Sequence, residues 1–276
     1  MIVVESAGLT DVGMKRKGNE DSLFLDDALR LYVVADGMGG HQAGEVASDL
    51  VVKTIKDYME RFMANADVEE LEDSDVSLSK HANRLMSGIH LSNQVVYQAA
   101  QSKSSYRGMG ATVAAVCFTD DTLIAANVGD SPIYLVRKGD ISLISVTHTV
   151  LAEQAFLNKT GDKHFGPEYG HMLTRAIGVE DTVRPDTCEI SCFRDDILVL
   201  SSDGLSNKVS EKEIAEMVSN RKPAKACRDL VDMANARGGN DNITVIVCKV
   251  RSVEQQSRIA GFFSRLMRII GFSKSS

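Results

Sequence analysis

Short apolar runs alternate with turn signals along most of this chain. The runs are rich in Val, Ile, Leu and Tyr, a pattern typical of β-strands. Turns such as Asp120-Asp121 and Lys138-Gly139-Asp140 are too short for a crossover helix, so we expect neighbouring strands to pair antiparallel. The predicted strands span residues 22–25, 31–36, 111–118, 122–130, 132–137, 196–203 and 242–250.

Two long stretches with helical periodicity interrupt the strands, at residues 43–64 and 78–101. The acidic segment between them, 67–75, predicts an exposed, solvated linker. Later helices are predicted over 210–219 and over 223–236, where a proline suits the first turn. Strands, paired helices, further strands and further helices, in this order, predict an α+β fold. We expect a four-layer α-β-β-α sandwich with two mainly antiparallel sheets flanked by helices.

Length and composition suit one domain with a short tail. The 276 residues are 43% hydrophobic, and we expect a domain over 1–253 and a tail over 254–276. The net charge of -7 argues against a nucleic-acid partner and suits either a protein that concentrates divalent cations or simple solubility. Five cysteines without CxxC spacing indicate core residues in a reducing compartment. With neither a secretory leader nor a run of about 20 apolar residues, we expect a cytoplasmic protein.

Acidic residues stand repeatedly at the ends of the predicted strands. Asp21 and Asp241 precede apolar strands, whereas Asp36, Asp130 and Asp203 close them. Carboxylates gathered at one rim of a sheet repel each other unless cations hold them. Hard oxygen ligands without paired Cys or His favour magnesium or manganese over structural zinc. A single Asp-Gly pair is also an ordinary turn, but five acids at strand ends favour a metal site.

Six short motifs follow one another in a characteristic order. They read RKGNED at 16–21, DGMGGH at 36–41, GDS at 129–131, LTRAIG at 173–178, SDGL at 202–205 and GNDNIT at 239–244. This series resembles the ordered motifs of the metal-dependent Ser/Thr protein phosphatases, the PPM or type two C family, in its bacterial form. The resemblance covers residues 6–250. It implies that 1–253 is a phosphatase catalytic domain.

The resemblance also implies a set of metal ligands. Asp36 would bridge two ions, Mn²⁺ or Mg²⁺, and the Gly37 carbonyl would bind one of them. Asp203 and Asp241 would complete the other site. In bacterial members, positions matching Asp130 and Asp203 bind a third, weaker ion.

Further residues are assigned to substrate and water by the same resemblance. Glu20 and Asp21 would hold waters on the ions, and Arg16 would bind the substrate phosphate. His41 either donates a proton to the leaving serine or threonine oxygen or is an ordinary turn histidine.

The implied activity is hydrolysis of phosphoserine and phosphothreonine by a metal-activated water at a dinuclear centre. Expected partners are phosphorylated Ser/Thr proteins and a cognate Ser/Thr kinase in a bacterium. Two alternatives remain open, a metal-binding pseudophosphatase that acts as a signalling module and a dinuclear hydrolase of small phosphate esters. Phosphate-loop, nucleophile-elbow and HExxH motifs are absent from the sequence.

Two segments lie outside these motifs. Residues 147–172 correspond to a variable flap, which we expect to recognise the phosphopeptide or gate the site. We expect its histidines, His148, His164 and His171, to be solvated loop residues. The tail over 254–276 is basic and amphipathic. It would either contact a partner or the inner face of the membrane, or pack against the domain itself.

Overall fold

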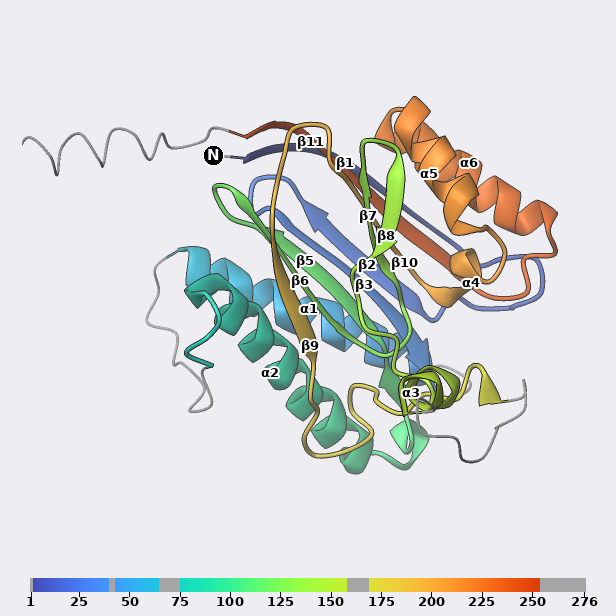
Figure 1. The fold of residues 1–276 in the computed structure, drawn as a ribbon. Coiled ribbons are helices and arrows are strands. Elements are labelled where there is room, and N and C mark those ends of the chain that lie inside the picture. Colours follow the sequence, from blue (N-terminus) through green and yellow to red (C-terminus); the bar gives the residue numbers. More distant parts are fainter. Residues whose placement is uncertain (1, 40–42, 65–74, 158–168, 254–276) are drawn as a thin grey trace, which may run out of the picture.

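The computed structural model describes residues 2–39, 43–64, 75–157 and 169–253. Two antiparallel sheets lie face to face, with helices on both outer sides (Figure 1). The predicted α-β-β-α sandwich is therefore confirmed. The predicted tail and all of the predicted acidic linker except Asp75 lie outside the described residues.

Each sheet is antiparallel throughout its described pairs. The first sheet has the order β1 (Ile2–Asp11), β11 (Ile243–Val253), β10 (Ile197–Ser201), β7 (Ile133–Arg137) and β8 (Asp140–Leu143). The second has the order β2 (Asp21–Asp26), β3 (Leu31–Met38), β5 (Val113–Phe118), β6 (Thr122–Val128) and β9 (Asp186–Ser191), with β4 (Gly110–Ala111) paired to β3.

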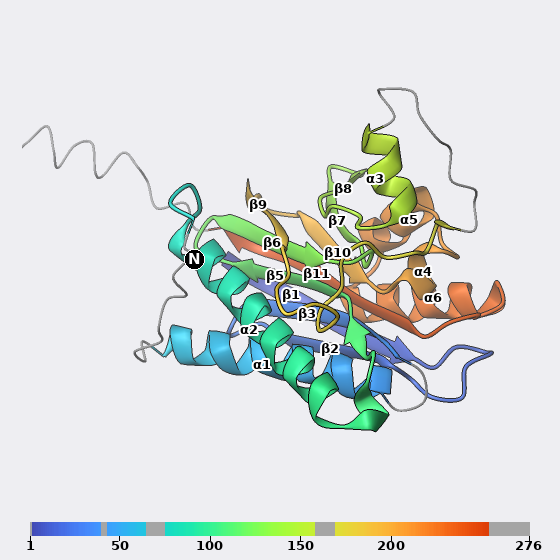
Figure 2. The ribbon, with the colours of Figure 1, turned by 90° about the horizontal axis from the view of Figure 1, so that it is seen from below.

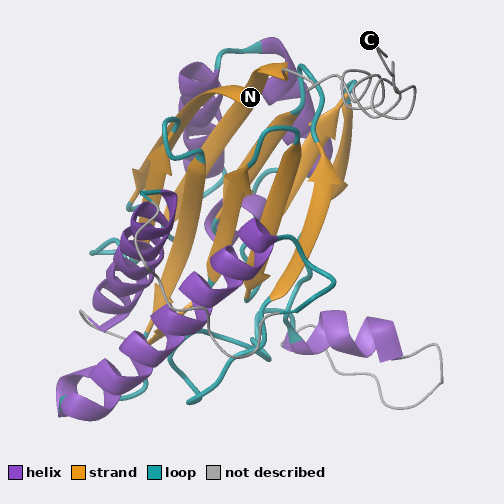
Figure 3. Cartoon of the chain, turned by 90° about the vertical axis from the view of Figure 1, so that its left-hand side faces the viewer, coloured by secondary structure: helices purple, strands orange, loops and turns teal. Residues whose placement is uncertain are grey.

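The central strands are apolar on both faces because each face is covered. Along β3, Leu31 and Val33 pack toward the helices, whereas Tyr32 and Val34 pack into the layer between the sheets. This alternation follows from the two-residue period of a strand. It explains why the run reads as continuously hydrophobic in the sequence. In Figure 3 the strands form the middle of the molecule and the helices lie outside them.

A pair of helices covers each sheet. Helices α1 (Ala43–Met63) and α2 (Lys80–Ser102) run side by side over the second sheet (Figure 2). Helices α5 (Glu211–Asn220) and α6 (Pro223–Ala236) cover the first. All four agree with the predicted ranges to within about two residues. The shorter helices are η1 (Ser104–Tyr106), α3 (Val150–Leu157) and α4 (Asp203–Ser206).

Three strands, β1, β8 and β9, are missing from the sequence prediction. Each lies at an edge of its sheet and is partly exposed, as Val3, Leu143 and Glu189 show. An edge strand is paired on one side only and does not need a continuous apolar run, so the pattern that identified the central strands is absent. Among the described helices, none is long and apolar enough to cross a membrane.

Candidate active site

Acidic side chains from both sheets meet at one end of the sandwich. Asp36 lies near the end of β3, Asp203 stands two residues after β10, and Asp241 stands two residues before β11. All three line one cavity of about 960 Å³. The cavity is also lined by Arg16, Glu20, Gly37 and Asp130. The sequence prediction that acids at strand ends converge is therefore confirmed for these residues.

Asp21 is not among the residues that line the cavity but pairs with Asp36 in the β2–β3 register. Its exposed fraction is only 7%. Oδ2 accepts a 2.8 Å hydrogen bond from Ser202 Oγ, whereas the buried Oδ1 has no partner among the described residues. A buried carboxylate oxygen without a donor is costly, and it suits contact with a cation or a cation-held water.

Burial and mutual repulsion disfavour the charged forms of these acids. Burial raises the pKa of Asp36 well above its usual range, and the carboxylates of Asp21 and Asp203 raise it further. Burial raises the pKa of Asp130 to about 6, with Asp203 as the next cause. The pKa of Asp21 is also raised to about 6, mainly by burial. Bound cations would relieve both penalties, so the donor set fits hard divalent ions.

The acids do not form a closed metal cage by themselves. Within the part of the chain that the structure describes, three or more His, Cys, Asp or Glu side chains are nowhere grouped closely enough to hold an ion unaided. Magnesium and manganese sites commonly complete their coordination with waters and main-chain oxygens. The observed arrangement therefore fits an open, hydrated centre better than a dedicated all-side-chain site.

Gly37 is required by close packing at the cavity wall. A Cβ atom there would overlap the carbonyl oxygen of Gly44 and press on that of Glu20. The Gly37 N–H donates to the Glu20 carbonyl at 3.1 Å. Glycine thus lets the end of β3 and the start of α1 approach each other at the cavity.

Arg16 lies at the mouth of the cavity and contacts one of the acids. Its Nη2 donates to Asp241 Oδ2 at 2.8 Å, and the two side chains are 50% and 37% exposed. Glu20 is positioned by its main chain, whose N–H donates to Asn242 Oδ1 at 2.8 Å. Burial raises the pKa of the Glu20 carboxyl.

Several polar residues that support the site were not predicted. Asn242 Nδ2 donates to the carbonyls of Val12 and Gly18, both at 3.0 Å, which ties the loop carrying Arg16 to the start of β11. Thr112 Oγ1 accepts the Asp36 N–H at 3.1 Å. Asn242 stands within the GNDNIT motif, which could have identified it, whereas Thr112 stands in a predicted strand with no distinguishing signal.

The predictions for the histidines have different outcomes. His41 and His164 lie outside the described residues. His171 is exposed and lines the cavity. The prediction for His148 is wrong, because its exposed fraction is 1% and both of its ring nitrogens have polar partners.

Comparison with known proteins agrees with this geometry. The sequence profile described as Protein phosphatase 2C matches residues 15–244. Serine/threonine phosphatase stp of Listeria innocua is 34% identical over 259 residues, covering 91% of this chain and 97% of that protein. Protein phosphatase PhpP of Streptococcus pneumoniae is 30% identical over 258 residues, covering 92% and 100%.

Solved structures extend the similarity to the fold. The Mycobacterium tuberculosis serine/threonine phosphatase PstP/Ppp superposes with a TM-score of 0.77 at 28% identity, covering 91% of this chain and 100% of that one. A structure of the PstP catalytic domain in complex with two manganese ions has the same TM-score at 29% identity and the same coverage. The chain belongs to the protein phosphatase 2C family of metal-dependent Ser/Thr phosphatases, which are phosphoric monoester hydrolases.

Proposed function

We propose that this chain dephosphorylates phosphoserine and phosphothreonine in proteins, using two divalent cations, Mn²⁺ or Mg²⁺, at the cavity. The observation that carries the proposal is the meeting of Asp36, Asp203 and Asp241, from distant parts of the chain, at one cavity. Among the residues that the structure describes, they have no lysine partner, and Arg16 on Asp241 is the one arginine paired with them.

Each acid has a separate proposed role. Asp36 would contact both ions, with the Gly37 carbonyl beside it, and Asp203 and Asp241 would hold the second ion. Glu20 and Asp21 would orient waters around them. When bound, such ions lower the pKa of an attacking water and offset the phosphate charge during in-line displacement.

Arg16 is the proposed phosphate ligand. Its guanidinium can form two parallel hydrogen bonds to a phosphate, which a lysine cannot. In the structure it binds Asp241, so a phosphate and this carboxylate would compete for the same group. Cations that neutralise Asp241 would favour release of Arg16 toward the substrate.

Further proposals concern a third ion, His41 and the partner proteins. Asp130, with Asp203, would hold a third, weaker ion, and His41 would be either a proton donor or a turn residue. A cognate Ser/Thr kinase would supply the phosphorylated partners. Neither a pseudophosphatase nor a small-ester hydrolase is favoured by the described site, whose acids are intact and whose relatives are named protein phosphatases.

Release of inorganic phosphate from a phosphothreonine peptide tests the proposal. We expect turnover with added Mn²⁺, loss after exhaustive chelation, and recovery when Mn²⁺ is returned. A small aryl phosphate serves as the comparison substrate. Full turnover in the chelated protein would contradict the metal mechanism, and hydrolysis of the aryl phosphate alone would contradict the protein substrate.

A further inference from the structure

His148 lies where the chain leaves the sandwich and returns to it. Its N–H donates to the Gly129 carbonyl at 3.0 Å, and its carbonyl accepts the Thr174 N–H at 3.0 Å. The next residue, Thr149, forms a β-bridge with Leu173. The two ends of the 149–173 segment, which includes α3, are therefore joined to each other and to the end of β6 at this residue.

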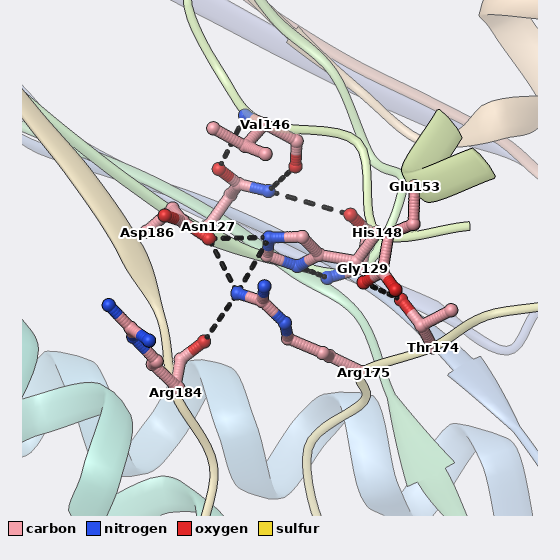
Figure 4. Close-up of polar contacts among 9 residues, drawn as sticks. All are labelled: Asn127, Gly129, Val146, His148, Glu153, Thr174, Arg175, Arg184 and Asp186. Atoms are coloured by element: carbon pink, nitrogen blue, oxygen red, sulfur yellow. Dashed lines mark hydrogen bonds and ion pairs between the residues drawn. The ribbon is translucent and has the colours of Figure 1, made fainter. Parts of the chain in front are cut away.

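The imidazole ring of His148 has a defined tautomer. The Gly129 N–H lies 3.0 Å from Nδ1, and a main-chain N–H can only donate, so Nδ1 is the acceptor (Figure 4). The proton is then on Nε2, which donates to Asp186 Oδ2 at 2.7 Å. The ring thus connects the end of β6 to the start of β9 through two different hydrogen bonds.

Arg175 stabilises this arrangement. Its Nη1 donates to Asp186 Oδ2 at 2.6 Å and to the Arg184 carbonyl at 3.2 Å (Figure 4). The same carboxylate oxygen therefore accepts hydrogen bonds from both Arg175 and His148. Burial lowers the pKa of His148, Asp186 raises it, and the positive charge of Arg175 lowers it. The neutral ring, which alone offers an acceptor at Nδ1, is the form that fits.

The turn held by His148 carries an acid of the cavity. Gly129 has φ +101°, and a Cβ there would lie 2.6 Å from Thr112 Cγ2, so only glycine fits. Asp130 follows it and lines the cavity. On the other side of Asp130, the hydroxyl of Ser131 lies 2.6 Å from that of Thr112. His148 thus holds one side of the turn, and Thr112 holds the other.

We propose that His148 is a positioning residue that fixes the Gly129–Asp130 turn. It thereby couples the placement of the Asp130 carboxylate to the Thr149–Leu173 bridge. The functional consequence rests on the proposed role of Asp130 as a ligand of a weakly bound ion. Thr112 also accepts the Asp36 N–H, so the Ser131 end of this turn is linked to a second acid of the same cavity. Loss of the Nδ1 acceptor would leave the Gly129 N–H buried without a partner and free the turn to move.

Two substitutions of His148 separate its two hydrogen bonds. The Oδ1 atom of His148→Asn can stand in for Nδ1 and accept from Gly129, whereas the longer amide of His148→Gln can reach Asp186 but not serve Gly129. His81→Gln is the control for loss of an imidazole elsewhere, because His81 lies on α2 against Phe62.

The direct readout is hydrogen exchange at the Gly129 amide, measured by NMR in the full chain without added metal. We expect slow exchange in the wild type, in His81→Gln and in His148→Asn, and exchange faster by at least about tenfold in His148→Gln. Equally slow exchange in His148→Gln would overturn the inference. If the variants do not fold, the ¹⁵N shifts of the wild-type ring decide, since a proton on Nδ1 at neutral pH contradicts the proposed acceptor.

Calorimetric titration with Mn²⁺ tests the functional consequence. We expect His148→Gln to lower the affinity for the most weakly bound Mn²⁺ by about tenfold, because it loses a group that orients a ligand. His148→Asn keeps that group and should change this affinity by less than about twofold. Asp130→Asn should remove this binding event. Unchanged Mn²⁺ binding in Asp130→Asn would refute the proposed ion at Asp130, while the exchange experiment would still decide the role of His148.

Discussion

An aspartate stands near each end of strand β10, buried at Asp196 and half-buried at Asp203, and the two have different partners. Before the strand, Asp196 receives hydrogen bonds from Arg137 Nε at 2.9 Å and Nη2 at 2.8 Å, and from the Phe193 N–H at 2.8 Å. After it, Asp203 accepts a hydrogen bond from Asn207 at 3.2 Å, and burial, followed by the nearby carboxylate of Asp241, raises its pKa. The protein supplies an arginine as the cation at the Asp196 end, whereas in the proposed function ions from solution take that place at the Asp203 end.

This contrast distinguishes an acid with a structural partner from acids that we propose to be functional. A buried carboxylate with a bidentate arginine stabilises the fold without any ligand. Burial, by contrast, raises the pKa of Asp36, Asp130 and Asp203, and the Asp203 carboxylate raises that of Asp36 and Asp130 further, which is unfavourable in the metal-free chain. Strained electrostatics of this kind are typical of functional sites.

The largest expected effect of a substitution is on activity at the cavity end. Asp36→Asn should lower kcat by at least about a hundredfold, since it removes a proposed ligand of both ions. The fold should persist, because the substitution also removes a source of repulsion. Steady-state hydrolysis of a phosphothreonine peptide checks this, with the exposed α1 residue in Asp49→Asn as control. An unchanged kcat would show that Asp36 is not a ligand.

At the opposite end of β10, we expect a substitution to lower the stability of the fold without changing the activity. Asp196→Ala removes the partner of Arg137, whose side chain is 33% exposed, and leaves the Phe193 N–H without its acceptor. We expect a loss of about 2 kcal/mol in the free energy of unfolding. Denaturant titration measures this loss, and Asp120→Ala, whose side chain is 62% exposed and 3.7 Å from Arg30, should cost less than about 0.5 kcal/mol. Equal losses of unfolding free energy in Asp196→Ala and Asp120→Ala would contradict the structural role of Asp196.

Arg16 pairs with Asp241 and is the proposed phosphate ligand, and its removal should have an intermediate effect. Arg16→Ala should raise KM for the phosphopeptide by about tenfold with a smaller change in kcat, since a guanidinium binds phosphate in both ground and transition states. Initial rates over a range of peptide concentrations separate the two parameters. A fall in kcat alone would make Arg16 a transition-state residue.

The smallest effect is on the pH dependence of stability in chelator. The folded pKa of Asp130 and of Asp21 is about 6, above the ordinary value near 3.9 in the unfolded chain. Between about pH 4 and 6 the folded state therefore binds more protons than the unfolded chain. The stabilisation that these protons give is lost as pH rises through this range. Melting temperatures of the chelated wild type and Asp130→Asn should converge at pH 4 and separate at pH 7, with the variant higher. A constant difference would contradict the raised pKa.

Features that leave a local pattern in the sequence could be predicted, whereas contacts between distant residues could not. The central strands and four long helices have clear periodicity, so these elements were predictable. Asp36 lies near the end of β3 and Asp203 two residues after β10, so the apolar runs before them pointed to both acids. Edge strand β9 lacks that pattern because one side is unpaired. His148 could not be predicted, because its partners Gly129 and Asp186 lie 19 and 38 residues away in the sequence.

Binding of Mn²⁺ to the chelated full chain tests the central claim most directly, that the acids at the cavity end of β10 are reserved for cations. Calorimetric titration of the wild type should show at least two bound ions, and Asp36→Asn should lose binding. Asp196→Asn, at the other end of the same strand, should bind as the wild type does. Absence of Mn²⁺ binding to the folded wild type, or full binding in Asp36→Asn, would contradict the account.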